Sequence, residues 1–382
     1  MVDEAALPPS RGLRLTRLKL GRFRNYETLS WAPAGRMAVI TGANGSGKTN
    51  LLEAISFLAP GRGLRGARIT EVATGGTGAW AAHGRFDTPD GALEIGTGTT
   101  SETPDRRVFR LDGQAPRNQA ELAARMAVVW LTPQMDRLFQ EGAAGRRRFL
   151  DRLVFAVEPG HAREVAAHDS AMAERRRLLA EGRRDAAWLS GLEDAMARHG
   201  VAVTAARAAL VAQLNAALAG GISGRFPAAR LALHSSIGEL LAVHPALAVE
   251  DSLRQSLSAA RARDAAAGAA QQGAHRDDLA LSDLATGLAA SGASTGQQKA
   301  LLIGVILGHA ALLAHARNAA PLLLLDEPST HLDPGRRLDL FAALSALSAQ
   351  VFLTGTDAET FAALRGEAAF WRTGANALHA DR

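Results

Sequence analysis

A glycine-rich segment places the strongest constraint on how this chain can fold: Gly42-Ala43-Asn44-Gly45-Ser46-Gly47-Lys48-Thr49. The apolar run Met37-Ala38-Val39-Ile40 leads directly into it, and apolar residues recur at helical spacing after Thr49. Closely spaced glycines let a chain turn sharply while its backbone N–H groups point inward. The pattern therefore predicts a strand, a phosphate-binding loop and a helix in direct succession.

The residues of this loop have the chemistry needed to hold the phosphates of a nucleotide. Backbone N–H groups at a helix start would surround phosphate oxygens, and here they come from Gly42, Ala43, Asn44, Gly45, Ser46 and Gly47. Lys48 would reach the β- and γ-phosphates, and the Thr49 hydroxyl would bind Mg²⁺. We therefore expect ATP and Mg²⁺ as the ligands.

A second candidate for nucleotide chemistry is the apolar run Leu322–Leu325, which is followed by Asp326 and Glu327. A continuous apolar run is typical of a strand buried on both faces. Asp326 would hold Mg²⁺ at the end of that strand, and Glu327 would be catalytic by polarising the attacking water. Lys48 would be the second catalytic residue, through the β- and γ-phosphates that it reaches. Taken alone, the pattern fits equally well a strand that enters a turn.

A third segment, Ser294-Thr295-Gly296-Gln297-Gln298, precedes an apolar helix that begins near Ala300. Small residues at a helix start expose N–H groups that suit an anion, although an ordinary helix cap has the same composition. The order of the three segments resembles the ABC-ATPase head. In that family the Ser-x-Gly segment of one subunit closes over the ATP of another. The resemblance implies that Ser294, Gly296 and Gln297 contact nucleotide in an ATP-dependent homodimer.

Five motifs narrow the resemblance to the RecF family, over about residues 13 to 357. They are Phe23-Arg24-Asn25-Tyr26, Lys48-Thr49-Asn50-Leu51-Leu52-Glu53-Ala54-Ile55, Arg146-Arg147-Arg148-Phe149-Leu150-Asp151, His275-Arg276-Asp277-Asp278-Leu279 and Gln297-Gln298-Lys299. The resemblance implies a slowly hydrolysing ATP switch in DNA replication, recombinational repair and the SOS response. It also implies binding to duplex DNA at single-strand gaps and junctions with single-stranded DNA, and work with RecO and RecR in loading RecA.

The chain departs from the family pattern at several positions of the expected site. Glu327 stands where the family usually has a second Asp, as in general ABC ATPases, and Lys299 replaces an arginine. Gln134 would serve as the glutamine that senses Mg²⁺ and the γ-phosphate, although a surface glutamine is an equally good interpretation. Thr354 or Thr356 would have to replace the switch histidine of ABC heads.

These segments predict an α/β protein with two domains. An ABC-ATPase head, a mixed sheet with the phosphate loop, would be formed by residues 1–135 and 270–382. A helical arm would occupy residues 136–269, where alanine, arginine, leucine and glutamate dominate from about Gly142 to Gly220.

Composition restricts the possible partners and compartment. The chain has no cysteine, which excludes disulfides and zinc–thiolate sites. The net charge is +5, and arginines cluster at Arg62, Arg65, Arg68 and Arg146–Arg148, as expected for DNA binding or for solvated helix faces. The apolar run Leu301–Leu313 is too short to cross a membrane. The first residues lack the order of a signal peptide, so we expect a cytoplasmic protein without a membrane partner.

Other functions fit parts of this pattern. An SMC-like ABC ATPase would need a long coiled coil, for which the interval between Lys48 and Ser294 is too short. A transporter subunit would have these two segments closer together, without so large a helical insertion. A DNA-binding scaffold in which ATP is a structural ligand and is not consumed also remains open. Single-turnover hydrolysis would separate that scaffold from an ATP-driven switch.

Overall fold

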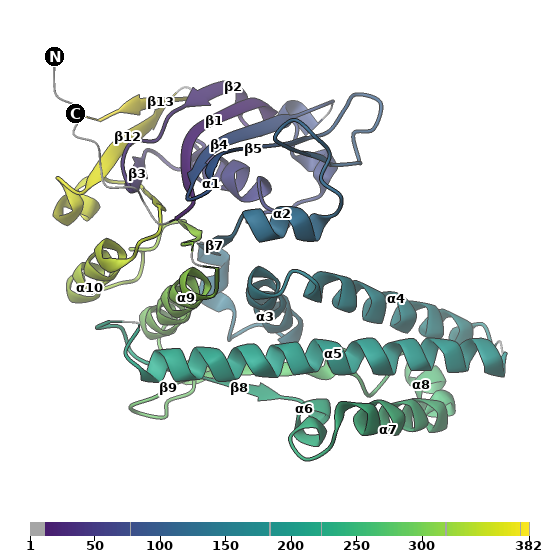
Figure 1. Cartoon of the computed structure of the whole chain (residues 1–382). Helices are drawn as coiled ribbons and strands as arrows, with labels where there is room; N and C mark the ends of the chain where they lie inside the picture. The colour runs from purple at the N-terminus through teal and green to yellow at the C-terminus, as the bar shows by residue number, and fades with distance from the viewer. Residues whose placement is uncertain are drawn as a thin grey trace. The chain divides into compact units, whose positions relative to one another are not determined.

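The computed structural model describes residues 12–76, 78–182, 185–222, 224–317, 319–374 and 376–381 (Figure 1). The chain divides into two compact units. The head unit consists of Met1–Asp136, Gly221–Pro227 and Thr295–Arg382, and the arm unit consists of Arg137–Gly220 and Ala228–Ser294. The head is therefore built from both ends of the chain, as the sequence predicts.

A six-stranded sheet forms the centre of the head unit. Its order is β13 (Ala377–Ala380), β12 (Ala368–Gly374), β3 (Met37–Thr41), β11 (Val351–Gly355), β10 (Leu322–Leu325) and β7 (Val128–Leu131). All neighbouring pairs are parallel except β12 with β13. Every residue of β3, β7, β10 and β11 is buried, which explains why apolar residues dominate these strands.

A second, antiparallel sheet of five strands belongs to the same unit. Its order is β2 (Tyr26–Trp31), β1 (Arg14–Phe23), β4 (Ala81–Thr88), β5 (Gly91–Gly98) and β6 (Val108–Leu111). The pairing of β1 with β4 shifts in register between Leu15 and Arg17. In the sequence, the leucines Leu13, Leu15, Leu18 and Leu20 alternate except for one extra residue after Leu15. Helix α1 (Lys48–Phe57) contacts β1 and β4 of this sheet and β11 of the other, so both sheets fix the phosphate loop at its start.

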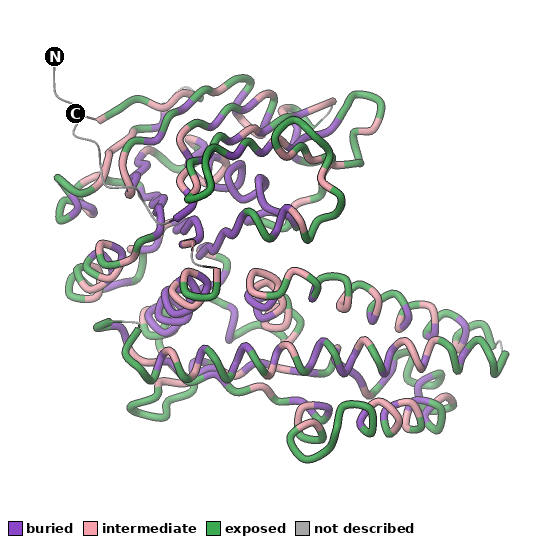
Figure 2. The backbone as a smooth tube through the Cα atoms, in the orientation of Figure 1, coloured by how far each residue is buried: buried purple, intermediate pink, exposed green. Residues whose placement is uncertain are grey.

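The other helices of the head unit are α2 (Gln119–Arg125), α9 (Thr295–Arg317) and α10 (Pro334–Ala346), with short 3₁₀ turns at Ile69–Glu71, Thr74–Gly76, Pro133–Arg137 and Glu359–Leu364. Helix α9 is apolar and long enough to cross a membrane, but 72% of its most apolar window is buried inside the protein (Figure 2). Burial of that kind is typical of a core helix.

The arm unit is mainly helical. Its helices are α3 (Ala143–Val157), α4 (His161–Ala180), α5 (Ala186–Ala219), α6 (Ser236–Leu241), α7 (Ala246–Ala259) and α8 (Arg261–Ala267), and its strands are β8 (Ala229–His234) and β9 (Asp278–Asp283). Two 3₁₀ turns span Ala274–Arg276 and Ala290–Gly292. Helix α5 is also long and apolar enough to cross a membrane, and 44% of its most apolar 18-residue stretch is buried inside the protein. The buried Arg175 of α4 pairs with Glu193 and Asp264, which ties three helices together.

The predicted domain boundaries need correction at two places. Residues 270–294, expected in the head, belong to the arm unit, and Gly221–Pro227, expected in the arm, belongs to the head unit. Residues 270–294 belong to the arm because β9 pairs with β8 along six residues. The return of strand-like sequence near residue 270 marks a strand correctly, but a strand pattern does not identify the partner strand.

Two of the RecF-like motifs meet inside the arm unit. The Arg146 guanidinium donates to both oxygens of Asp278, at 2.7 and 2.8 Å, and Arg147 donates to the Asp277 carbonyl at 2.8 Å. The Asp277 carboxylate accepts in turn from Thr204 and from the buried Arg207. In this arginine run, then, the first two side chains hold the start of β9, whereas Arg148 is exposed.

Candidate functional site

The glycine-rich loop connects β3 to α1 and takes the left-handed backbone conformations that its glycines allow. The φ angles are 153° at Gly42, 80° at Gly45 and 101° at Gly47. A Cβ at Gly42 would lie 2.3 Å from the Thr373 hydroxyl, and one at Gly47 would lie 2.4 Å from the Asn25 amide nitrogen. Side chains are therefore excluded at both positions, while Ala43, Asn44 and Gly45 face solvent.

Lys48 is folded into the loop although it carries a charge. Its side chain is buried, and its Nζ donates to the carbonyls of Gly42 at 2.7 Å and Ala43 at 3.0 Å. Burial lowers the pKa of Lys48, while the negative charges of Glu327 and Asp326 act in the opposite direction. The lysine thus lies within electrostatic reach of both carboxylates predicted at the end of β10.

Thr49 and Asp326 meet as the sequence predicts. The Thr49 hydroxyl donates to the two oxygens of Asp326 at 2.9 and 3.0 Å. Asp326 is buried and also accepts a 2.7 Å hydrogen bond from the Thr354 hydroxyl. A hydroxyl and a carboxylate in contact provide the hard oxygen ligands that Mg²⁺ prefers, so this pair fits the expected metal.

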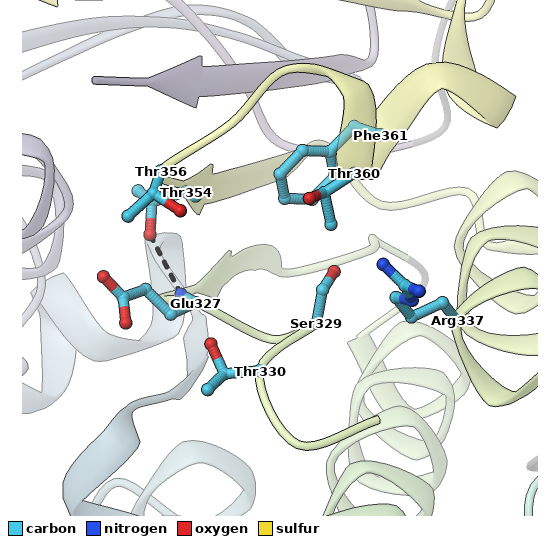
Figure 3. A pocket seen from close by; sticks show the side chains of 9 residues that line it. Glu327, Ser329, Thr330, Arg337, Thr354, Thr356, Thr360 and Phe361 are labelled. Atoms are coloured by element: carbon cyan, nitrogen blue, oxygen red, sulfur yellow. Dashed lines mark hydrogen bonds between the residues drawn. The ribbon is translucent and has the colours of Figure 1, made fainter. Parts of the chain in front are cut away.

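Glu327 follows directly and has a left-handed backbone, with φ 49°. Its N–H donates to the Thr354 hydroxyl at 3.0 Å, and its carbonyl accepts from Lys299 Nζ at 3.0 Å. The backbone is held on both sides, while the side chain lines a cavity of about 160 Å³ (Figure 3). Such strain at an acidic residue is common at catalytic sites, where the surrounding structure maintains it.

Lys299 gains a role that its motif did not reveal. It is fully buried in α9 and pairs with Asp136 at 3.2 Å, besides holding the Glu327 carbonyl. Burial lowers the pKa of Lys299 and raises that of Asp136, and each charge partly offsets the effect on the other. Asp136 was missed as a site residue, although it stands only two positions after Gln134.

The residues Phe23-Arg24-Asn25-Tyr26, where β1 turns into β2, support the phosphate loop. The Tyr26 hydroxyl donates to the Gly47 carbonyl at 3.2 Å, and Asn25 accepts from Asn50 at 2.6 Å. Arg24 forms a two-bond pair with the buried Glu53 of α1 at 2.7 and 2.8 Å. These contacts explain the motif as a brace for the loop and its helix, which the sequence pattern alone does not show.

The remaining candidates lie elsewhere in the structure. Ser294 and Gln297 are exposed at the start of α9. Gly296 accepts from Arg336 at 3.2 Å, and a Cβ there would lie 2.7 Å from the His331 carbonyl oxygen, so a side chain would not fit. Gln134 is exposed, and within the described residues it makes no hydrogen bond to Thr49 or Asp326.

We expect Thr354→Val to weaken both the site and the fold. The buried Thr354 hydroxyl donates to Asp326 and accepts from the Glu327 N–H, so the substitution removes one hydrogen-bond partner from each of these two groups. Loss of a buried partner costs about 1–3 kcal/mol. Chemical denaturation measures this cost, and Thr356→Val, at an exposed position, is the control. Equal unfolding free energies for both variants would contradict the positioning role of Thr354.

Comparison with known proteins places these features in a family. The chain matches the RecF/RecN/SMC N-terminal domain family over residues 14–370. It is 46% identical to the DNA replication and repair protein RecF of Mesorhizobium japonicum, over 93% of this chain and 95% of that protein. It is also 46% identical to RecF of Rhizobium meliloti, over 95% of this chain and 97% of that one.

Solved structures agree on the fold. A structure of the recombination mediator protein RecF with ATP in the RecFOR pathway superposes with a TM-score of 0.84 at 20% identity, covering 99% of this chain and 100% of that one. An SMC head domain from Pyrococcus furiosus gives 0.53 at 13% identity, covering 97% and 96%. The predicted ABC-ATPase head with an inserted helical domain is confirmed. The chain therefore belongs to the RecF family.

Proposed function

We propose that this protein is an ATP-dependent DNA-binding protein of replication and recombinational repair. The observation that carries the proposal is the cluster of Lys48, Thr49, Asp326 and Glu327, which joins a phosphate loop to two carboxylates. Its relatives are named DNA replication and repair proteins, and a neighbour of the same fold was solved with ATP.

Each side chain of the cluster has one task in this proposal. The N–H groups of the loop and Lys48 bind the phosphates of ATP, which is the anion that a helix start favours. Thr49 and Asp326 hold Mg²⁺, with Gln134 as a further ligand, and the metal neutralises charge on the phosphates. Glu327 orients the attacking water and accepts its proton.

ATP binding then converts the monomer into a dimer of two copies of the chain. Ser294, Gly296 and Gln297 of one copy would close over the ATP held by the loop of the other. Exposed arginines after α1, at Arg62, Arg65 and Arg68, would lie on the DNA-binding surface of the pair. The pair would act at gaps and junctions in the cytoplasm, with RecO and RecR, to load RecA.

Ser294→Arg tests the switch. The added bulk and charge would meet the ATP of the second copy and block closure, while the phosphate loop of each copy stays intact. We expect the variant to bind ATP, to remain monomeric and to lose most ATP-stimulated binding to duplex DNA. DNA binding releases counterions, so the logarithm of the affinity falls as the logarithm of the salt concentration rises. This fall should be less steep in the variant, by about 0.9 in slope for each DNA phosphate that the protein no longer neutralises.

The measurement is fluorescence anisotropy of labelled DNA over a salt series, with ATP and with ADP, beside sedimentation of the protein. Ser291→Arg is the matched control, because it adds the same charge at an exposed position three residues earlier. Equal affinities and slopes for wild type and Ser294→Arg in both nucleotides would assign DNA binding to the monomer and overturn the switch.

A further inference from the structure

A small cavity lies beside Glu327 in the head unit, and Thr354, whose hydroxyl accepts from the Glu327 N–H, is one of its lining residues (Figure 3). Three segments line it. The turn after β10 contributes Glu327, Ser329 and Thr330, helix α10 contributes Arg337, and the end of β11 with the following 3₁₀ turn contributes Thr354, Gly355, Thr356, Thr360 and Phe361. A Cβ at Gly355 would lie 2.4 Å from the Phe361 ring, so glycine lets this wall close tightly.

The cavity has an acidic end and a basic end. In Figure 3 the Glu327 carboxylate lies on one side, and the Arg337 guanidinium lies on the other, beside the hydroxyl of Ser329. Hydroxyls of Thr330, Thr356 and Thr360 line the space between them. Polar side chains therefore make up most of the lining, beside Gly355 and the aromatic ring of Phe361.

Arg337 and Ser329 have polar groups that the protein itself leaves unused. Within the described residues, the Arg337 side chain has no carboxylate partner, because neighbouring acids pair elsewhere: Asp333 with Arg336, Glu359 with Arg365. The Ser329 hydroxyl is buried without a hydrogen-bond partner among those residues. Buried polar groups are nearly always satisfied, so the unpaired Ser329 hydroxyl, which lies beside the half-buried Arg337 guanidinium, indicates a missing hydrogen-bond partner.

The size and charge of the cavity define that acceptor. A volume of about 160 Å³ is below the roughly 300–1,000 Å³ typical of drug-sized ligands, so a nucleoside does not fit. A guanidinium flanked by hydroxyls is the donor set that binds tetrahedral oxyanions such as phosphate. The nearby Glu327 carboxylate disfavours a second negative charge, unless a proton lies between the two groups.

We propose that this cavity is a binding subsite for inorganic phosphate, held by Arg337 and Ser329 and bordered by Glu327. The proposal rests on the proposed ATPase function for the origin of its ligand. In that reaction the water oxygen forms a bond to the γ-phosphorus, and the bond from that phosphorus to the bridging oxygen breaks. ADP keeps the bridging oxygen, Glu327 takes the proton of the water, and the phosphate produced moves toward Arg337.

Calorimetric titration with sodium phosphate tests the site on protein saturated with ADP and Mg²⁺, against sodium chloride of equal ionic strength. We expect Arg337→Gln to bind phosphate about tenfold more weakly or worse, because charged hydrogen bonds are lost. Ser329→Ala should bind more weakly by a smaller factor. Glu327→Gln should bind more tightly, since a repelling charge is removed.

Two controls separate this cavity from other phosphate sites. Arg336→Gln removes the same charge one residue earlier, from a side chain bonded to Asp333 and the Gly296 carbonyl, and should bind phosphate like wild type. Lys48→Ala without nucleotide should also still bind phosphate, because the phosphate loop is not the site measured. Wild-type affinity in Arg337→Gln, or loss of binding in Lys48→Ala alone, would overturn the subsite.

A steady-state assay separates failure of the subsite from failure of the proposed function. If the chain hydrolyses ATP, added phosphate should slow turnover of wild type, and Arg337→Gln should need about tenfold more phosphate for the same effect. Turnover that phosphate inhibits equally in both proteins refutes the subsite and leaves the ATPase intact. Arg337-dependent phosphate binding without any hydrolysis supports the subsite and refutes the ATPase.

Discussion

Lys48→Ala is expected to remove most ATP binding and every activity that depends on it. The ammonium group is buried in the loop and is bonded to the carbonyls of Gly42 and Ala43, so it is positioned for phosphates that enter there. A hydrogen bond to a charged group contributes about 1.5–3 kcal/mol, which corresponds to a loss of roughly 10- to 150-fold in affinity.

Titration with a fluorescent ATP analogue measures this loss. Lys19→Ala is the matched control, since Lys19 is an exposed lysine of β1 and its removal takes away the same charge far along the sequence from the loop. Circular dichroism should show the same fold for both variants. An unchanged affinity in Lys48→Ala would mean that the nucleotide binds elsewhere, and the catalytic assignment of the carboxylates would lose its basis.

The parts of the site that could be predicted from sequence are those whose chemistry is local. The loop between β3 and α1 is continuous in sequence, so its glycines, Lys48 and Thr49 identify it directly. Asp326 and Glu327 follow a strand of four successive leucines, which indicate that the strand is buried. Parallel strands of one sheet end at the same edge, which is why these two segments meet.

The parts that sequence did not provide depend on partners far apart along the chain. Thr354 reaches Asp326 because β11 lies beside β10 with Leu353 opposite Leu325, and no local pattern specifies that register. The same holds for Lys299 and Asp136, which meet across a separation of 163 residues. The pairing of β9 with β8, which moved a domain boundary, is a third example.

The two threonines that follow Leu353 differ in how their hydroxyl groups are engaged. Sequence left Thr354 and Thr356 as equal replacements for the switch histidine. Both threonines line the cavity beside Glu327. The Thr354 hydroxyl is bonded to Asp326 and to the Glu327 N–H, whereas Thr356 is exposed. We therefore infer that Thr356 is the residue available to a γ-phosphate.

Glu327→Gln should bind ATP like wild type and hydrolyse it about 10²- to 10⁴-fold more slowly, which is the range for loss of a general base. The amide keeps the size of the side chain, and the backbone contacts to Thr354 and Lys299 do not involve the carboxylate. Asp326 and Thr49 also stay in place for Mg²⁺. Binding and hydrolysis should therefore separate in this variant.

Slow hydrolysis should prolong the closed state, so Glu327→Gln should accumulate ATP-bound dimers that wild type forms only transiently. Single-turnover assays give the rate, and sedimentation with ATP and with ADP gives the dimer fraction. Glu367→Gln is a suitable control, because that carboxylate is bonded to Ser345 outside the site. If Glu327→Gln turns over like wild type, Glu327 is not the base, and Thr356 or Asp357 would be the next position to change, because both directly follow β11, whose end lines the same cavity.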